Sequence, residues 1–252
     1  MKILLLDIET APHRVYAWGL WDQNIALNQI EEPGYTLCWA AKWLGDKGVK
    51  FSSLMKDGHQ RMIEKVHALI NEADAVVHYH GTRFDMPTLN QEFVLCGLNP
   101  PSSYKQIDLL KTVKKQFRLP SNKLDYVARH LGLKGKLSHK GMDLWKGCMK
   151  KDAKSWKEME AYNIQDTLTL EDVYLKLLPW IIEHPNQNLY TDKLDRICPT
   201  CGGNHLQSRG TTKSKTMIYK RFQCNDCGSW SRERVTEMLK EKKAAILVAD
   251  RG

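Results

Sequence analysis

A short, uninterrupted apolar run near the start of the chain constrains the fold more than any other feature. Residues Ile3–Leu6 include no polar side chain, which is typical of a strand buried on both faces of its sheet. Asp7 and Glu9 follow where this run ends and alternate with Ile8, so both carboxylates point to one side of the strand. We therefore expect an α/β fold with two acidic side chains on one face of its sheet.

A third carboxylate, Asp166, lies on the buried side of a predicted helix. From Met159 onward the apolar positions follow one helical stripe, and Tyr162 and Asp166 are four residues apart on it. A carboxylate that faces the core costs several kcal/mol unless a cation or hydrogen bonds compensate it. A fourth acid, Asp85, stands just before Pro87, where capping of a helix is the alternative explanation.

Taken together, these acids predict bound divalent metal. Their hard oxygen ligands, without a nearby histidine or cysteine, favour Mg²⁺ or Mn²⁺ over zinc. Two such ions about 4 Å apart activate a water molecule and stabilise the departing oxygen in phosphodiester cleavage. The alternative is that each acid is an isolated cap, an ion-pair partner or a surface residue.

At these positions the sequence resembles the DEDD superfamily of 3′-to-5′ exonucleases, which share an RNase H-like fold, over roughly residues 1 to 185. The placement of Tyr162 four residues before Asp166 assigns the tyrosine branch, since a histidine-type member has its histidine where this chain has Ala161. The three motifs match Asp7-Ile8-Glu9-Thr10, Phe84-Asp85 with Leu89, and Tyr162-Asn163-Ile164-Gln165-Asp166.

The resemblance implies a role for each matched side chain. Asp7 would bridge both metal ions, and Glu9 and Asp166 would complete the shell of the tighter ion. Asp85 would hold the second ion through water, and Tyr162 would orient the attacking water. The expected catalytic cofactors are therefore two Mg²⁺ or Mn²⁺ ions.

Four cysteines form the second strong pattern. Cys198 and Cys201 are followed, after 22 residues, by Cys224 and Cys227. Two Cys-x-x-Cys pairs at such spacing predict a zinc ribbon, in which four thiolates hold one Zn²⁺. Disulfides or a redox dithiol are the alternatives, although disulfides need an oxidising compartment. A module this small cannot fold on its apolar core alone, so we expect the zinc to be structural.

Basic residues are concentrated in two stretches of a chain whose net charge is +9. Residues 190–252 hold 13 Lys and Arg against 7 Asp and Glu, and residues 105–157 hold 15 against 4. We interpret the second stretch as a path for single-stranded nucleic acid, with solvated helix faces as the alternative. The ribbon, whose basic residues surround aromatic ones, is interpreted as a nucleic-acid-binding module, with protein contact as the alternative.

Four tryptophans crowd the early part of the chain. Trp39 and Trp43 lie on a predicted strand, where core packing explains them. We predict that Trp18 and Trp21 stack on the terminal base of a substrate. With the basic residues, the predicted substrate-binding set is Trp18, Trp21, Lys136, Lys213, Lys215, Arg221 and Trp230.

The predicted fold class is an RNase H-like mixed sheet flanked by helices, followed by a small zinc-ribbon domain. The predicted domains are 1–187, 190–240 and a short tail at 241–252. No apolar stretch approaches the about 20 residues that span a bilayer, so we expect a soluble, intracellular, cytoplasmic protein. The predicted strands are 2–8, 36–43, 49–55, 75–79 and 104–107, the helices are 59–71, 86–97, 109–117, 123–132 and 153–182, and 15–32 is a further strand or a loop.

We therefore predict a metal-dependent 3′-to-5′ exonuclease that uses water as its nucleophile, with a ribbon that helps to hold nucleic acid. Single-stranded DNA is the first choice of substrate on the resemblance, RNA stays open, and a replication or repair protein is a candidate partner. Two alternatives also stay open: an RNase H-like endonuclease or junction resolvase, and a nucleic-acid-binding module with a vestigial nuclease site. Tyr162 favours the exonuclease over the endonuclease.

Overall fold

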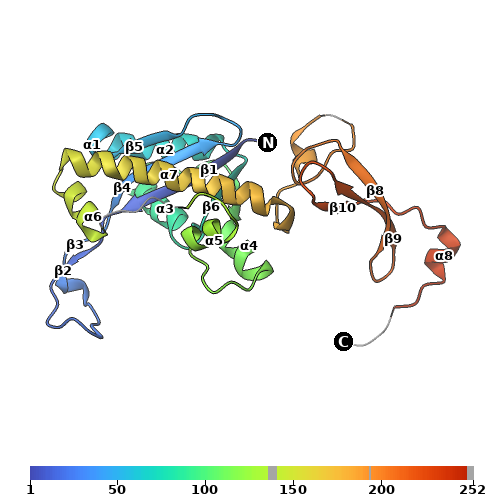
Figure 1. The fold of residues 1–252 in the computed structure, drawn as a ribbon, viewed down its shortest axis with the longest axis horizontal. Helices are drawn as coiled ribbons and strands as arrows, with labels where there is room; N and C mark the ends of the chain where they lie inside the picture. The colour runs from blue at the N-terminus through green and yellow to red at the C-terminus, as the bar shows by residue number, and fades with distance from the viewer. Residues whose placement is uncertain (136–140, 193, 249–252) are drawn as a thin grey trace. The chain divides into compact units, whose positions relative to one another are not determined.

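The computed structural model describes residues 1–135, 141–192 and 194–248, and it divides into two compact units, Lys2–Leu175 and Lys176–Gly252. Figure 1 labels the helices and strands of both units. In chain order, the first unit contains β1 (Ile3–Thr10), β2 (Arg14–Val15), the 3₁₀ helix η1 (Leu27–Gln29), β3 (Ile30–Glu32), β4 (Thr36–Trp43), β5 (Lys50–Ser53), α1 (Leu54–Asp57), α2 (His59–Glu72), β6 (Ala75–His78), α3 (Asp85–Leu95), β7 (Lys105–Asp108), α4 (Leu109–Gln116), α5 (Leu124–His130), α6 (Met142–Met149) and α7 (Ala153–Leu177).

The main sheet of the first unit has β1 at its centre. Among the described residues its strand order is β5-β4-β1-β6-β7. β4 is antiparallel to β1 and to β5, whereas β6 is parallel to β1 and to β7. This mixed sheet with its surrounding helices confirms the predicted α/β class.

Alternate side chains of β1 pack against different helices. Leu4, Leu6 and Ile8 join a core that also contains residues of α2 and α3. The opposite face of the sheet is covered by α6 and α7, and Figure 1 shows α7 crossing the sheet. Since successive side chains of a strand point to opposite faces, Asp7 and Glu9 lie on the α7 side.

Two polar contacts hold α7 against β4. The Nζ of Lys42 and the Oε1 of Glu171 lie 2.5 Å apart, and the two side chains are only 6% and 15% exposed. The hydroxyl of Thr167 donates to the carbonyl oxygen of Ala40 at 3.3 Å. These contacts fix the register of the helix that carries Tyr162 and Asp166.

Most predicted elements lie within a few residues of the observed ones, and the differences have local causes. The last predicted helix reaches residue 182, but α7 ends at Leu177 because Pro179 lacks an N–H and restricts the residue before it. The uncertain segment 15–32 includes part of a short hairpin, β2–β3, in which Arg14 pairs with both Glu31 and Glu32. Helix α6 was not predicted.

The second unit contains η2 (Leu178–Trp180), η3 (Gln187–Tyr190), β8 (Leu206–Lys213), β9 (Ile218–Cys224), β10 (Trp230–Arg232) and α8 (Lys240–Ala244). Its described strands form an antiparallel sheet in the order β10-β9-β8. No helix in the described part of the chain is both long enough and apolar enough to cross a membrane.

Candidate functional site

Three of the four predicted acids converge between the central strand and α7. Within the described residues, ligand oxygens of Asp7, Glu9 and Asp166 all lie within 4.8 Å of one another. Asp166 is fully buried, whereas Asp7 and Glu9 are half-buried. At this separation two unit charges repel by about 3 kcal/mol if the effective dielectric constant is about 20. Such a cluster favours a bound cation.

The fourth acid, Asp85, lies beside this cluster as the first residue of α3. Its side chain is 4% exposed, and its Oδ1 accepts a hydrogen bond of 3.3 Å from the backbone N–H of Ile8. Ile8 stands between Asp7 and Glu9 on β1, so the Asp85 carboxylate meets the strand at the cluster. The helix-capping alternative does not describe Asp85, because the N-cap position of α3 is occupied by Phe84.

A buried turn fixes the start of α3. The N–H of Gly81 donates to Nδ1 of His78 at 3.1 Å, and a Cβ on Gly81 would lie 2.5 Å from the His78 ring, so only glycine fits. Burial lowers the pKa of His78, which keeps the ring neutral. The carbonyl oxygen of Gly81 then accepts from the N–H of Met86, so the turn sets where Asp85 stands.

Asn163 is a residue of the site to which the sequence analysis gave no role. Its side chain is fully buried, and its Nδ2 donates to Oδ2 of Asp7 at 2.7 Å and to the Asp7 carbonyl oxygen at 3.4 Å. A neutral amide that donates to a carboxylate favours the ionised form and fixes its orientation. The available signal was its place three residues before Asp166, on the same side of α7.

Tyr162 lies one turn before Asp166 and is 7% exposed. Its ring packs edge-on against Trp145 of α6, with ring centroids 6.0 Å apart. Helix α6 therefore holds the tyrosine in place, although neither α6 nor Trp145 was predicted to do so.

The β1 strand changes register at the site. Glu9 pairs with Cys38 but Thr10 pairs with Thr36, so β1 and β4 slip by one residue between Glu9 and Thr10. Such irregularities re-aim side chains and are common next to active sites. Burial, with Glu9 nearby, raises the pKa of the Cys38 thiol well above its usual range, so this neighbour stays protonated and apolar.

The donor set of the acidic cluster fits Mg²⁺ or Mn²⁺. Three convergent carboxylates offer hard oxygen ligands of the kind these ions prefer. The sulfur-bearing neighbour Cys38, which pairs with Glu9, is a thiol whose raised pKa suppresses the thiolate that softer metals bind.

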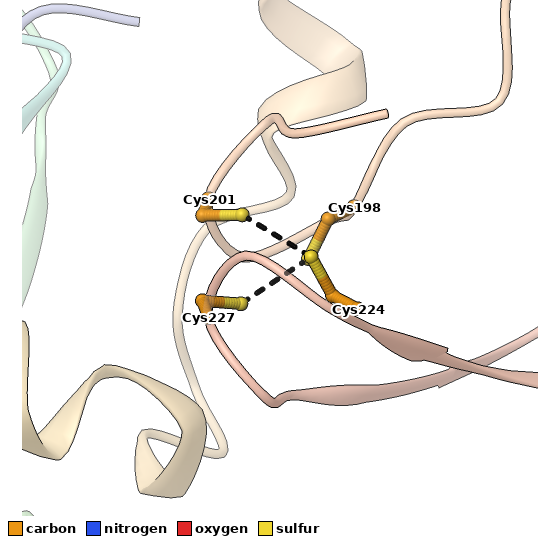
Figure 2. Close-up of side chains that lie close together, drawn as sticks. All are labelled: Cys198, Cys201, Cys224 and Cys227. Atoms are coloured by element: carbon orange, nitrogen blue, oxygen red, sulfur yellow. Dashed lines mark hydrogen bonds between the residues drawn. The ribbon is translucent and has the colours of Figure 1, made fainter. Parts of the chain in front are cut away.

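The four ribbon cysteines form a second candidate metal centre. Figure 2 shows their side chains turned toward one another from two loops. The sulfurs of Cys198 and Cys227 are 3.7 Å apart, and those of Cys201 and Cys224 are 3.6 Å apart. These separations far exceed a disulfide bond of about 2.0 Å, and four sulfurs placed about 2.3 Å from one ion in a tetrahedron would be about 3.8 Å apart. The cluster therefore fits zinc.

The two cysteine turns are built alike. The N–H of Gly202 donates to the Cys198 carbonyl oxygen and that of Gly228 to the Cys224 carbonyl oxygen, each at 2.9 Å. Both glycines have positive φ, 76° and 81°, which other residues adopt only with strain. The buried hydroxyl of Ser229 lies within 3.2 Å of two of the sulfurs. Hydrogen bonds to sulfur of this kind orient thiolate ligands.

The predicted substrate-binding residues are exposed but scattered. Trp18 and Trp21 lie in the loop between β2 and β3, with 98% and 84% of their surface exposed. They are therefore not packed into the core, whereas Trp39 on β4 is buried as predicted. Lys136 lies outside the described residues. The ribbon members, all exposed and on or beside its sheet, are Lys213, Lys215, Arg221 and Trp230.

Comparison with known proteins agrees with this fold. The sequence model of the RNase H superfamily matches residues 26–178, a range that includes Asp85, Tyr162 and Asp166 and begins after β1. The structure is similar to a family B DNA polymerase from the hyperthermophilic archaeon Pyrobaculum calidifontis, with a TM-score of 0.50 and 19% identity. That match covers 70% of this chain but only 25% of the polymerase chain. No curated protein matches the sequence.

Proposed function

The chain belongs to the RNase H superfamily, and from this premise we propose that it is a metal-dependent 3′-to-5′ exonuclease that hydrolyses single-stranded DNA. One observation carries the proposal: the oxygens of Asp7, Glu9 and Asp166 converge within 4.8 Å. These acids come from β1 and α7, which are the first and last elements of the first unit in sequence. Local folding therefore does not explain why their side chains meet. A hydrolase that binds divalent metal through these carboxylates does explain it.

The residues that would hold the catalytic metal are Asp7, Glu9 and Asp166, with Asp85 beside them. A bound pair of Mg²⁺ or Mn²⁺ ions would supply an activated water and stabilise the charge of the departing oxygen. Asn163 holds the Asp7 carboxylate in one orientation through its 2.7 Å hydrogen bond. The N–H of Ile8 does the same for Asp85.

Tyr162 supports an exonuclease within this superfamily. Its ring is held by Trp145 on one side, and it stands one helical turn from Asp166 on α7. From this place its hydroxyl would orient the attacking water, which requires no change in its own protonation. The enzyme then needs no covalent intermediate, because the nucleophile is water.

The ribbon would contribute binding rather than chemistry. The four cysteines would occupy every position of a tetrahedral zinc, as in structural sites, whereas catalytic zinc keeps an open position. The net positive charge of the ribbon would attract a phosphate backbone. A polymerase or repair protein as partner is a proposal that rests on the structural likeness alone.

The proposal is tested with single-stranded DNA labelled at its 5′ end, in the presence of Mg²⁺ or Mn²⁺. We expect a ladder of products that shorten from the 3′ end, and no products from the Asp7→Asn variant. Release of the labelled terminal nucleotide at the earliest times would contradict the proposed polarity.

A circular single strand of the same sequence is the control for endonuclease activity. It offers no end, so the exonuclease leaves it intact, whereas cleavage of the circle would support the endonuclease alternative. An RNA strand measured beside the DNA strand decides the substrate class. A wild-type chain that leaves linear DNA, RNA and branched DNA whole, while binding them, would refute nuclease function.

A further inference from the structure

The ribbon sheet has two chemically different faces. Side chains of β9 alternate between them, and the pairing of Trp230 with Gln223 and of Arg232 with Arg221 assigns β10 to the same alternation. One face carries aromatic rings and guanidinium groups, which we call the stacking face: Tyr219, Arg221, Trp230 and Arg232. The opposite face carries Lys220, Phe222, Cys224 and Ser231.

On the stacking face each guanidinium lies over an aromatic ring. The Cζ of Arg221 is 4.8 Å from the centroid of the Trp230 ring, and that of Arg232 is 4.1 Å from the centroid of the Tyr219 ring. Both distances are within the about 6 Å of a cation–π contact. Trp230 is 53% exposed, so more than half of a large apolar side chain faces solvent. Each arginine holds its ring in one orientation.

The two faces also differ in how their positive charges are paired. Two cations of the ribbon away from the stacking face are paired with carboxylates: Lys220 with Glu237 at 2.6 Å and Arg196 with Glu233 at 2.7 Å. Arg221 instead donates to a backbone carbonyl, that of Arg209, at 2.8 Å. Arg232 likewise donates to the carbonyl of Glu233, at 3.1 Å, and within the described residues neither arginine has a carboxylate within 4.0 Å.

The two rings are far apart along the sheet. Trp230 stands beside Gln223, four residues along β9 from Tyr219, which corresponds to about 14 Å at about 3.4 Å per residue. A shallow hollow of about 260 Å³ lies between β8 and β10 and is lined by Thr212, Arg221, Trp230, Ser231 and Arg232. An extended ligand with separate flat groups and negative charge matches this spacing.

We propose that the stacking face binds single-stranded nucleic acid, with unpaired bases stacked on Trp230 and Tyr219 and with phosphates held by Arg221 and Arg232. The inference deepens the proposed function, because it gives the ribbon a preference for unpaired strands. Base–aromatic stacking needs exposed base faces, which a duplex buries between its own pairs. An acidic protein segment would satisfy the arginines but would leave the exposed Trp230 ring and the half-buried Tyr219 ring without a flat partner.

The experiment measures binding without cleavage, using the full chain with Asp7→Asn and a fluorescent oligothymidine of 20 nucleotides. Chelators are omitted because they would remove the ribbon metal, and zinc content is measured for every variant. We expect Trp230→Ala to weaken binding at least about fivefold, and Trp230→Phe to restore part of the loss. Tyr219→Ala should act in the same direction.

The charge contribution has a matched control. Arg221→Gln and Lys220→Gln remove the same charge from neighbouring positions on opposite faces of β9. We expect Arg221→Gln to reduce the slope of log affinity against log salt by about 0.7, the value for one phosphate contact on a single strand. Lys220→Gln should change it much less.

Equal affinity of Trp230→Ala and Lys220→Gln would overturn the proposal, and so would equal affinity for a duplex of the same length. Competition by polyglutamate but not by unlabelled oligothymidine would assign the face to an acidic protein instead. The result is separable from nuclease function. Stacking-face binding by a chain that cleaves nothing would refute only the proposed activity, and cleavage with no effect of Trp230→Ala on binding would refute only this inference.

Discussion

Replacement of Asn163 by alanine tests whether the acidic cluster works as one unit. The Asn163 side chain is fully buried, and its Nδ2 donates to Asp7 Oδ2 at 2.7 Å. Its own Oδ1 has no hydrogen-bond partner within the described residues, so the substitution removes a donor from Asp7 without leaving another partner unsatisfied. A hydrogen bond to a charged acceptor contributes about 1.5–3 kcal/mol.

If that contribution orients Asp7 for metal binding, its loss lowers kcat/KM about 10- to 150-fold at limiting metal concentration. The assay is degradation of the labelled single strand across a titration of Mg²⁺ and Mn²⁺. We expect the metal midpoint to move to higher concentration and the rate to recover partly at saturating Mn²⁺, since excess metal offsets a misplaced ligand.

Gln165→Ala is the control, because Gln165 is on the same helix and partly buried but donates to Thr169 at 3.3 Å rather than to the cluster. Thermal unfolding of both variants reports any loss of the fold. The reasoning is refuted if Asn163→Ala and Gln165→Ala share the same activity and the same metal midpoint.

Three further predictions follow from contacts described above. Lys42→Met should destabilise the first unit by about 3–5 kcal/mol in denaturant unfolding, because it leaves Glu171 buried and unpaired. Adding Glu171→Leu should restore most of that loss. A Lys42→Met variant as stable as the wild type would contradict this. Cys224→Ser should abolish stoichiometric zinc and expose β8–β10 to proteolysis, and retention of one zinc per chain would exclude four-cysteine coordination. The pKa of His78 is lowered in the folded chain, so below about pH 6.5 the unfolded chain binds a proton that the folded chain excludes. The free energy of unfolding should therefore fall as the pH falls, by at most about 1.4 kcal/mol per pH unit. Unfolding titrations at several pH values should show a flatter slope for His78→Gln.

The elements that could be predicted are those whose burial follows from the local pattern of apolar residues. β1 begins with the fully apolar run Ile3–Leu6, β4 is mostly apolar, and both of these stretches are buried in the sheet. The inward stripe of α7 likewise placed Tyr162 and Asp166 on the side of the helix that faces β1. The candidate zinc site could be predicted from the spacing of four cysteines, because thiolates bind zinc.

Elements that depend on distant partners could not be predicted in this way. Helix α6 buries only Leu144 and Cys148 and contains Gly147, so neither periodicity nor helix propensity marks it. Its glycine is required by packing, because a Cβ there would lie 2.0 Å from the Ser155 hydroxyl. Strand β8 has little apolar alternation and is held by its pairing with β9. The contact of Asn163 with Asp7 joins residues 156 apart.

That separation along the chain has a consequence for how the protein is made. β1, which carries Asp7 and Glu9, leaves the ribosome before α7, which follows only after more than a hundred further residues. A nascent chain that stops just before α7 holds three of the four acids but lacks Asp166, together with Tyr162 and Asn163. The acidic cluster is therefore completed in one late step, so the order of synthesis would delay the proposed nuclease activity until α7 has emerged.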